Sequence, residues 1–468
     1  MARRPPNSVW RDNFAELKKP LAREEARVEA SRCLYCYDAP CVKACPTHID
    51  IPRFIRQIAA ADPLGSGATI LEANALGHSC ARVCPVEVLC EGDCVYHDWH
   101  DKPIHIARLQ RYATDAVHAS DELPFEPGAD TGKRVAVVGA GPAGAACAVY
   151  LRRLGHAVTI FEKRKLPGGL NTSGVAEYKM NAKTSLEELR MLFRLGCSVK
   201  TGTTVDGALA AKLMRDFDAV FLGVGLARAR GLGIPGEGLP GVMDSLSFIE
   251  RVKAHDRSLP GSSAATVVIG GGNTAVDAAT QSRRTGASTV VLAYRRAAED
   301  MSAYDFEVAL ARTDGAEVLL NAAPKRILGR KKVEGVEFAR TKTVKGKLVE
   351  EKKTFIVPCD RVITAIGQSK NRALPEFFGA ALNDDGTIKV DAKTLRTSHA
   401  KVFAGGDMVN GGKEVVNASA DGKRAAWGIH QTFIPGADPD EDSAYWVSTI
   451  DGRVVAPIVP RAEDVHEK

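Results

Sequence analysis

The sequence has no long hydrophobic run, and this absence argues against a membrane-spanning helix. Of its 468 residues, 45% are hydrophobic and 26% are charged, yet no apolar stretch approaches the ~18 residues that a transmembrane helix needs. The start, Met1-Ala-Arg-Arg-Pro-Pro, lacks the apolar core of a secretion signal. The net charge of +6 is small for this length, which argues against nucleic acid as a partner. We therefore expect a cytoplasmic protein of about three domains, at the usual ~150 residues each.

Cysteine is scarce over most of the chain and concentrated near its start. Eight of the 11 cysteines lie between Cys33 and Cys94, which in a cytosolic protein favours metal or iron–sulfur ligation over disulfides. The two compact runs read Cys33-x-x-Cys36-x-x-x-x-Cys41-x-x-x-Cys45-Pro46 and Cys80-x-x-x-Cys84-Pro85, followed by Cys90 and Cys94. Cys-Pro pairs that close such runs are typical of iron–sulfur proteins. Zinc is the alternative, but zinc sites usually show two short-gap pairs and often histidines.

A dinucleotide-binding fingerprint follows the cysteine-rich part. The apolar run 135–138 predicts a buried strand, and Gly139-x-Gly141-Pro142-Ala143-Gly144 then opens a helix. Glycines allow the tight turn and the approach of a pyrophosphate to the helix N-terminus. A second strand, 157–161, ends in Glu162, where an acid can hold the ribose hydroxyls of an adenosine. The later pair Gly168-Gly169, followed by Leu170, is expected to bring backbone against a flavin ring, an ordinary turn being the alternative.

A second fingerprint begins at Gly270. Strand 266–269 precedes Gly270-x-Gly272-Asn273-Thr274-Ala275, and the next strand ends in Tyr294-Arg295-Arg296. No acid stands where a ribose 2′-hydroxyl would be held, and two guanidinium groups can instead pair with a 2′-phosphate. This favours NADPH over NADH, although arginines here can also be solvated surface residues.

No Cys-x-x-Cys follows Cys36, so the second half of the chain lacks the thiol pair of a thioredoxin reductase. A nicotinamide site, a flavin site and iron–sulfur clusters together indicate electron transfer, in which the cofactors perform the chemistry. We therefore assign no side chain as an essential general acid or base. A degenerate homologue that acts only as a scaffold is the alternative from another class, and the intact glycine motifs and cysteines argue against it.

The cysteine runs, with Asn74-Ala-Leu-Gly-His-Ser-Cys80 and Cys90-Glu-Gly-Asp-Cys94, resemble a domain shared by dihydropyrimidine dehydrogenase and the small subunit of bacterial glutamate synthase. The resemblance implies two 4Fe–4S clusters, one held by Cys33, Cys36, Cys41 and Cys94 and the other by Cys45, Cys84, Cys90 and Gln110. A glutamine is the last of these ligands in dihydropyrimidine dehydrogenase, whereas the glutamate synthase subunit tends to have a glutamate there. It also implies that Gly406 and Asp407, at the end of a strand at 402–404, contact FAD. Without the resemblance, eight thiols would divide four and four with Cys80 as a ligand, so both ligand sets stay open.

The predicted fold is α/β, with two Rossmann-like domains after an α-helical iron–sulfur domain and the nicotinamide domain inserted into the FAD domain. The expected boundaries are 1–128 for the iron–sulfur domain, 129–240 and 362–434 for the two parts of the FAD domain, 241–361 for the nicotinamide domain and 435–468 for a tail. These modules leave no segment for an FMN barrel or a glutaminase. The resemblance therefore implies a hetero-oligomer in which an FMN/iron–sulfur partner reduces uracil or thymine; the alternatives are a glutamate synthase small subunit and a free-standing NADPH:ferredoxin-type reductase.

Overall fold

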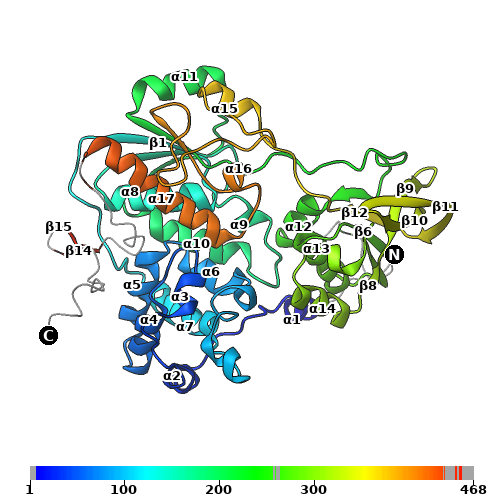
Figure 1. Ribbon diagram of the computed structural model, residues 1–468, viewed down its shortest axis with the longest axis horizontal. Helices are drawn as coiled ribbons and strands as arrows, with labels where there is room; N and C mark the ends of the chain where they lie inside the picture. The colour runs from blue at the N-terminus through cyan, green and yellow to red at the C-terminus, as the bar shows by residue number, and fades with distance from the viewer. Residues whose placement is uncertain are drawn as a thin grey trace. The chain divides into compact units, whose positions relative to one another are not determined.

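The computed structural model describes residues 7–256, 259, 264–435, 437, 448–450 and 453–455. The chain divides into two compact units (Figure 1). The smaller unit contains the described residues up to Leu17, together with Ser173–Ala182 and Ala227–Ser369. The larger unit contains Lys18–Thr172, Lys183–Leu226 and the described residues from Lys370 onward. Among the helices of the described ranges, none is both long and apolar enough to cross a membrane.

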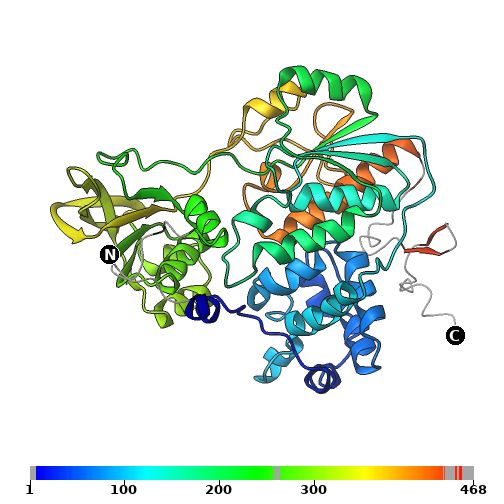
Figure 2. The same ribbon diagram turned by 180° about the vertical axis from the view of Figure 1, so that it is seen from behind.

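The larger unit begins with a helical module. Its helices are α2 (Arg23–Ser31), α3 (Pro40–Ala44), α4 (Ile51–Ala59), α5 (Pro63–Ala73), α6 (Gly77–Val83) and α7 (Ile106–Ser120), with 3-10 turns η1 (Val86–Val88) and η2 (Val95–Trp99). Asp50 and Asp62 start α4 and α5 by accepting hydrogen bonds from backbone N–H groups of the first turn, at 3.0 and 2.8 Å. The apolar face of α4 is buried in the module. Figures 1 and 2 show this helical module, in blue and cyan, from opposite sides.

A parallel five-stranded sheet forms the rest of the larger unit, in the order β13-β4-β1-β2-β3. Its strands are β1 (Arg134–Val138), β2 (Ala157–Phe161), β3 (Ser198–Lys200), β4 (Ala219–Leu222) and β13 (Val402–Ala404). The helices of this part are α8 (Pro142–Arg153), α9 (Leu170–Ser173), α10 (Ala182–Phe193), α11 (Gly207–Asp216), α15 (Ala373–Phe377), α16 (Asp407–Asn410) and α17 (Val415–Phe433). Because β13 pairs with β4, a strand near residue 400 completes a sheet that begins near residue 134.

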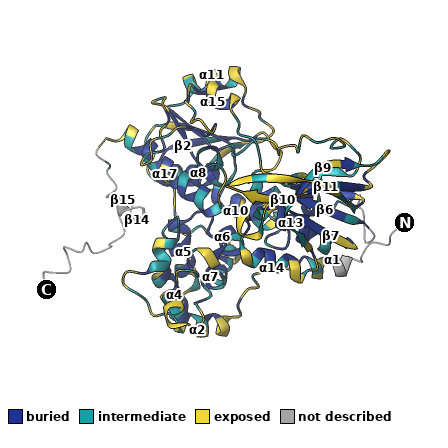
Figure 3. Ribbon diagram, turned by 45° about the vertical axis from the view of Figure 1, so that its right-hand side comes forward, coloured by how far each residue is buried: buried dark blue, intermediate teal, exposed yellow. Residues whose placement is uncertain are grey.

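The smaller unit has its own parallel sheet, in the order β5-β12-β6-β7-β8, and an antiparallel sheet β11-β10-β9. The strands are β5 (Val242–Asp244), β6 (Ala265–Ile269), β7 (Thr289–Ala293), β8 (Glu317–Leu319), β9 (Ala322–Leu328), β10 (Gly335–Val344), β11 (Lys347–Pro358) and β12 (Arg361–Thr364). Its helices are α1 (Asn7–Asn13), α12 (Ser245–Lys253), α13 (Asn273–Arg284), α14 (Asp305–Thr313) and the 3-10 turn η3 (Ala298–Asp300). In both units the central strands are buried (Figure 3), as parallel strands covered by helices are.

The boundaries of the two compact units differ from the expected domain boundaries. The smaller unit takes in α1 and the ten residues Ser173–Ala182, and its main segment runs over Ala227–Ser369 rather than 241–361. Its sheet still uses β12, which ends at Thr364 and pairs with β6, so the chain leaves this unit after its last strand. Most of the expected tail, 435–468, lies outside the described residues. Within it, β14 (Ser448–Ile450) pairs with β15 (Arg453–Val455) in antiparallel fashion.

Candidate cofactor sites

The first glycine loop joins β1 to α8 in the larger unit. Gly139 has a φ of +99°, and its N–H donates to the Phe161 carbonyl at 2.8 Å. A Cβ at Gly139 would lie 2.6 Å from the Gly223 oxygen, and one at Gly144 would lie 1.9 Å from the Gly139 oxygen. Glycine is needed at both positions because neighbouring backbone fills the space of a side chain. The turn leads directly into α8, which begins at Pro142, and a helix N-terminus is a binding place for phosphate.

The second glycine pair, Gly168-Gly169, belongs to another loop, which packs against the loop between β1 and α8. The Gly168 N–H donates to the Ala140 carbonyl at 2.8 Å. Gly169 has a φ of +55°, and a Cβ on it would lie 3.0 Å from the Gly141 Cα. The two loops therefore touch through their backbones, with Leu170 beginning the short helix α9 directly afterwards. This contact joins the two expected flavin-binding motifs into one surface.

Glu162 is fixed at the end of β2 beside the first loop. One of its carboxylate oxygens accepts a hydrogen bond from the Ala140 N–H and the other accepts one from the Arg164 N–H, both at 2.8 Å. The residue is buried. Its position at the end of the second strand of the βαβ unit is the one at which an acid holds a ribose. These two backbone hydrogen bonds fix the orientation of the carboxylate.

Asp407 follows a tight turn at the end of β13. Gly406 has a φ of +70°, and its N–H donates to the Asp421 carboxylate at 2.9 Å. The Asn410 side chain donates to the same Asp421 oxygen at 3.2 Å. Burial raises the pKa of Asp407, and the negative charge of Asp421 adds to this rise. Asp421, on α17, is thus the residue that holds the turn, and its role was not predicted from the sequence.

In the smaller unit, the corresponding loop joins β6 to α13. Gly270 has a φ of +158°, and its N–H donates to the last carbonyl of β7 at 3.0 Å. A Cβ at Gly271 would lie 2.4 Å from the Tyr294 ring, so that ring packs on the loop. Asn273 accepts a hydrogen bond from the Tyr304 N–H at 2.9 Å. The remaining predicted residues stand at the helix start, which is formed by Gly272 as N-cap and by Asn273, Thr274 and Ala275 in the first turn of α13.

Arg295 and Arg296 directly follow Tyr294 at the end of β7, and both side chains are exposed. Their backbone is fixed on both sides. The Arg295 carbonyl accepts from the Thr341 hydroxyl at 2.7 Å, and the Arg296 carbonyl accepts from the Asn321 N–H at 3.0 Å. Exposed guanidinium groups on a rigid strand end are suited to bind phosphate in a bidentate manner.

The segment Ser173–Ala182 packs within the smaller unit. Tyr178 is fully buried, and its hydroxyl donates to Asp277 of α13 at 2.6 Å. The Lys179 ammonium pairs with Asp277 at 2.9 Å and with Glu307 of α14 at 2.6 Å. These contacts fix the segment to the helix that carries the second glycine fingerprint.

The expected ligands of the first cluster gather in the helical module. Burial raises the pKa of the Cys41 thiol to about 12, and the negative charges of Cys33, Cys94 and Cys36 raise it further. Burial likewise raises the pKa of Cys33, and Cys36 and Cys94 act on it in the same direction. The four thiols are therefore near one another although Cys94 is distant in sequence. Such a set of thiols suits iron–sulfur ligation, in which the bound metal removes the protons.

Three further thiols form a second group, which is more deeply buried. Burial raises the pKa of Cys90 well above its usual range, and the charges of Cys45 and Cys84 contribute. All three residues are buried, whereas Cys33, Cys36 and Cys41 are half-buried. No group of three His, Cys, Asp or Glu side chains in the described parts of the chain could hold a single metal ion. A 4Fe–4S cluster binds each thiolate at a different iron, so its ligands are spread around a cube rather than around one ion.

Of the two candidates for the eighth ligand, one lies on α6 and the other contacts α6 from α7. Cys80 is buried on this helix, and a hydrogen bond with Cys80 is the main cause that raises the pKa of Cys84. Gln110, on α7, is 7% exposed, and its amide N–H donates to the Gly77 carbonyl at 2.7 Å. This bond fixes the orientation of the amide, whose oxygen is the atom able to bind iron. Either ligand set fits these positions.

A buried hydrogen-bond network joins α6 to the flavin-type part of the larger unit, which is the parallel sheet β13-β4-β1-β2-β3 with its helices and glycine loops. The Asn171 amide, one residue after Leu170, donates to the Ser79 hydroxyl at 2.9 Å. Glu188 of α10 accepts from the N–H groups of His78 and Ser79 at 3.0 Å, and also from the Ser79 hydroxyl. Burial raises the pKa of Glu188 to about 7, against the lowering effect of these hydrogen bonds. No local pattern marks Glu188, because an acid on a helix usually faces solvent.

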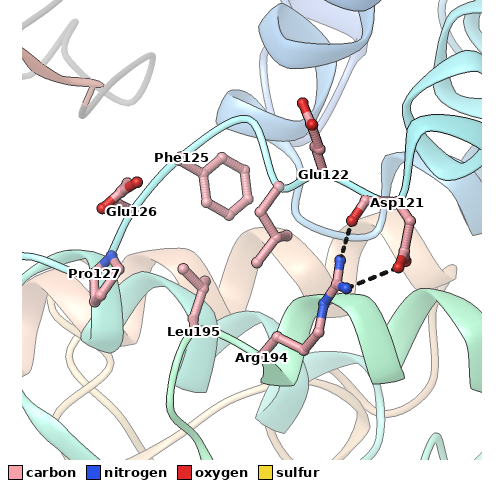
Figure 4. Close-up of a pocket in the computed structure, with 8 residues that line it drawn as sticks. Asp121, Glu122, Phe125, Glu126, Pro127, Arg194 and Leu195 are labelled. Atoms are coloured by element: carbon pink, nitrogen blue, oxygen red, sulfur yellow. Dashed lines mark hydrogen bonds and ion pairs between the residues drawn. The ribbon is translucent and has the colours of Figure 1, made fainter.

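A hollow of about 520 Å³ lies elsewhere in the larger unit, along the stretch 121–127 (Figure 4). Arg194 lines it and donates to the Asp121 carboxylate at 3.0 Å and to the Asp121 carbonyl at 2.5 Å. The lining contains none of the glycine-loop residues or cysteines described above. The hollow is therefore separate from the expected cofactor sites, and its ion pair ties the linker to the end of α10.

Comparison with known proteins agrees with this geometry. Residues 10–122 match the family described as dihydropyrimidine dehydrogenase domain II, 4Fe-4S cluster. Residues 133–422 match the pyridine nucleotide-disulphide oxidoreductase family. These matches define the class: the chain is an NAD(P)H-dependent oxidoreductase with FAD and iron–sulfur cofactors.

The curated relatives make the assignment narrower. A glutamate synthase (NADPH) small chain from Halomonas elongata is 35% identical over 89% of this chain and 92% of its own length. An NAD-dependent dihydropyrimidine dehydrogenase subunit PreT from Salmonella typhimurium is 35% identical over 86% of this chain and 93% of its own length. The chain thus belongs to the pyridine nucleotide-disulphide oxidoreductase family, in the branch that carries an N-terminal iron–sulfur domain.

Solved structures agree on the fold. Mycobacterium tuberculosis FprA in complex with NADPH superposes with a TM-score of 0.53 at 20% identity, covering 64% of this chain and 84% of that one. The thioredoxin reductase of T. acidophilum gives a TM-score of 0.50 at 22% identity, over 64% of this chain and 97% of its own. The predicted fold class, oxidoreductase class and cofactors are confirmed. The individual ligand residues stay predictions.

Proposed function

We propose that this chain is the electron-input subunit of a dihydropyrimidine dehydrogenase. It oxidises NAD(P)H at FAD and passes electrons through two 4Fe–4S clusters to an FMN-containing partner, which reduces uracil or thymine to the 5,6-dihydro form. The relatives named as subunits support a partner. Between the two named activities, Gln110 favours the pyrimidine assignment, because the resemblance implies a glutamine at this position in dihydropyrimidine dehydrogenase and a glutamate in the glutamate synthase subunit. The Gln110 amide is held by its hydrogen bond to the Gly77 carbonyl.

One observation carries the proposed direction of electron flow, namely the difference in burial between the two cysteine groups. Cys45, Cys84 and Cys90 are buried, and they lie in the module whose helix α6 is hydrogen-bonded to Asn171 and Glu188 of the flavin-type part. In the other group, Cys94 is also buried, but Cys33, Cys36 and Cys41 are half-buried, so this group is closer to solvent. Electrons that enter at the flavin loop would therefore reach the buried cluster first and leave from the exposed one.

The protein contributes binding and orientation to this reaction. FAD, when bound, accepts a hydride and can release its electrons singly. The first glycine loop and Glu162 would hold its pyrophosphate and ribose, and Asp407 would face the ribityl side. The second loop would hold NAD(P)H, with Arg295 and Arg296 available for a 2′-phosphate.

A glutamate synthase small subunit is the second candidate, because a relative with that name is as similar as the dihydropyrimidine dehydrogenase subunit. The identity of the partner protein distinguishes the two proposed activities. An FMN and iron–sulfur protein that co-purifies and supports NAD(P)H-dependent uracil reduction would favour our proposal, whereas a large amidotransferase would favour glutamate synthesis.

The route is tested with the Cys36→Ser variant. We expect NAD(P)H to reduce its flavin at the wild-type rate, because the nicotinamide and flavin residues are intact. Electron delivery to the partner should fall to background, because the exposed cluster is missing. Stopped-flow absorbance follows the first reaction, and dihydrouracil formation follows the second. Unchanged delivery in a variant that has lost this cluster would contradict the route; Cys197→Ser, which changes a thiol outside both cysteine groups, is the control.

A further inference from the structure

Lys423 is a buried lysine on α17. Only 5% of the residue is exposed. Its ammonium donates to the carbonyls of Thr47 and Ala73, both at 2.9 Å, and lies 5.9 Å from the centroid of the Tyr150 ring. All of these partners are neutral, and Lys423 has no ion-pair partner in the described parts of the chain. Carbonyl groups and an aromatic face replace part of the lost hydration, but they supply no compensating charge.

A buried charge without a counter-charge is costly, so such a lysine calls for a nearby anion. The candidate is the second cysteine group. Thr47 is two residues after Cys45, and its hydroxyl is 3.3 Å from the Cys45 sulfur. Burial lowers the pKa of Lys423 to about 7, and negative charge at Cys45, followed by that of Glu72, acts in the opposite direction and favours the ammonium form. Cysteine-ligated clusters carry net negative charge, and their potentials depend on the charges and hydrogen bonds around them.

The same helix also reaches the flavin-type turn. Asp421, two residues before Lys423, holds the Gly406 N–H at the end of β13. Residues two apart on an α-helix point about 200° apart, so α17 directs Asp421 to one side and Lys423 to the other. One rigid helix therefore joins the expected flavin site to the surroundings of Cys45.

We propose that Lys423 tunes the cluster held by Cys45, Cys84 and Cys90, stabilising its one-electron reduced form and thereby favouring electron transfer from the flavin. This inference rests on the proposed function. The electron comes from flavin that NAD(P)H has reduced, and the cluster gains one negative charge that the ammonium offsets. Lys423 acts through its charge and makes no bond to the reacting atoms.

The test is a redox titration of anaerobic protein, in which EPR follows both clusters. Variants Lys423→Met and Lys423→Gln remove the charge, Lys423→Arg keeps it, and Lys212→Met removes an exposed charge from α11 of the same unit. In both neutral variants we expect reduction of the buried cluster to become about tenfold less favourable, which is about 59 mV for one electron. The Arg variant and the Lys212 control should stay near wild type, and the exposed cluster should shift less than the buried one.

Iron, sulfide and FAD contents are measured on every protein, so that folding and tuning are separated. Equal potentials in wild type and in cluster-loaded Met and Gln variants would overturn the proposal for Lys423 and leave the proposed function intact. Loss of the buried cluster from all three variants would also overturn it, because Lys423 would then be a packing residue. Loss from the two neutral variants with retention in the Arg variant would support a need for the charge. A wild-type protein without a cluster at Cys45 would overturn the proposed function itself.

Discussion

The turn that precedes Asp407 gives the sharpest quantitative prediction. Asp421 accepts hydrogen bonds from the Gly406 N–H at 2.9 Å and from the Asn410 amide at 3.2 Å. In Asp421→Ala both donors lose their acceptor. A buried donor left unsatisfied costs about 1–3 kcal/mol, and ~1.4 kcal/mol is a factor of ten in a binding constant. If the turn binds FAD, the dissociation constant of FAD should rise about 5- to 150-fold.

Two further variants separate the hydrogen bond from the charge. Asp421→Asn keeps an oxygen that can accept from Gly406, so we expect a smaller loss of FAD affinity than in the alanine variant. Asp384→Ala removes an exposed acid from the same unit and should bind FAD as the wild type does. The assay is titration of the deflavinated protein with FAD, followed by quenching of flavin fluorescence. Wild-type FAD affinity in Asp421→Ala would refute the reasoning.

Two other predictions concern charge. In Arg295→Ala, loss of a charge-assisted bond of about 1.5–3 kcal/mol to a 2′-phosphate should lower the ratio of kcat/KM for NADPH over NADH about 10- to 150-fold; an unchanged ratio would rule out this role. Glu188 concerns stability, because burial raises its pKa in the folded state to about 7 from an ordinary value of 4.5. The folded protein holds a proton there that the unfolded chain has released, so this contribution is complete below about pH 4.5 and is lost as the pH rises towards 7. In the wild type, the free energy of unfolding by urea should fall by up to about 3 kcal/mol across this pH window, and Glu188→Gln should abolish that fall. The same pH dependence of this free energy in variant and wild type would contradict the assignment.

Local requirements explain what could be predicted from the sequence. Gly139 and Gly270 both have positive φ at strand ends, and a Cβ on either would meet backbone. A motif of this kind is visible in the sequence because the constraint acts on one residue and its nearest neighbours. The cysteine runs follow the same logic, since spacing within a run limits which thiols can share a cluster.

Long-range contacts explain what could not be predicted. Tyr178 and Lys179 follow the flavin-type loop in sequence, yet they pack on Asp277 and Glu307 of the smaller unit. Glu188 meets His78 across 110 positions, and Lys423 meets Thr47 across 376. Neither the acid nor the lysine is distinguishable in sequence from a solvated helix residue, because its role depends on burial that distant segments create.

The sequence by itself determined the modules of this protein, their cofactor classes and the residues that form each glycine turn, because short-range sterics and ligand chemistry dictate them. The tertiary structure alone decided which carboxylates and cations are buried and which groups they contact. It brings Asp421 to the Gly406 turn and Lys423 to the carbonyls next to Cys45, on one helix. Folding is needed for this because a charge acquires a strong influence only when packing removes the water that would screen it.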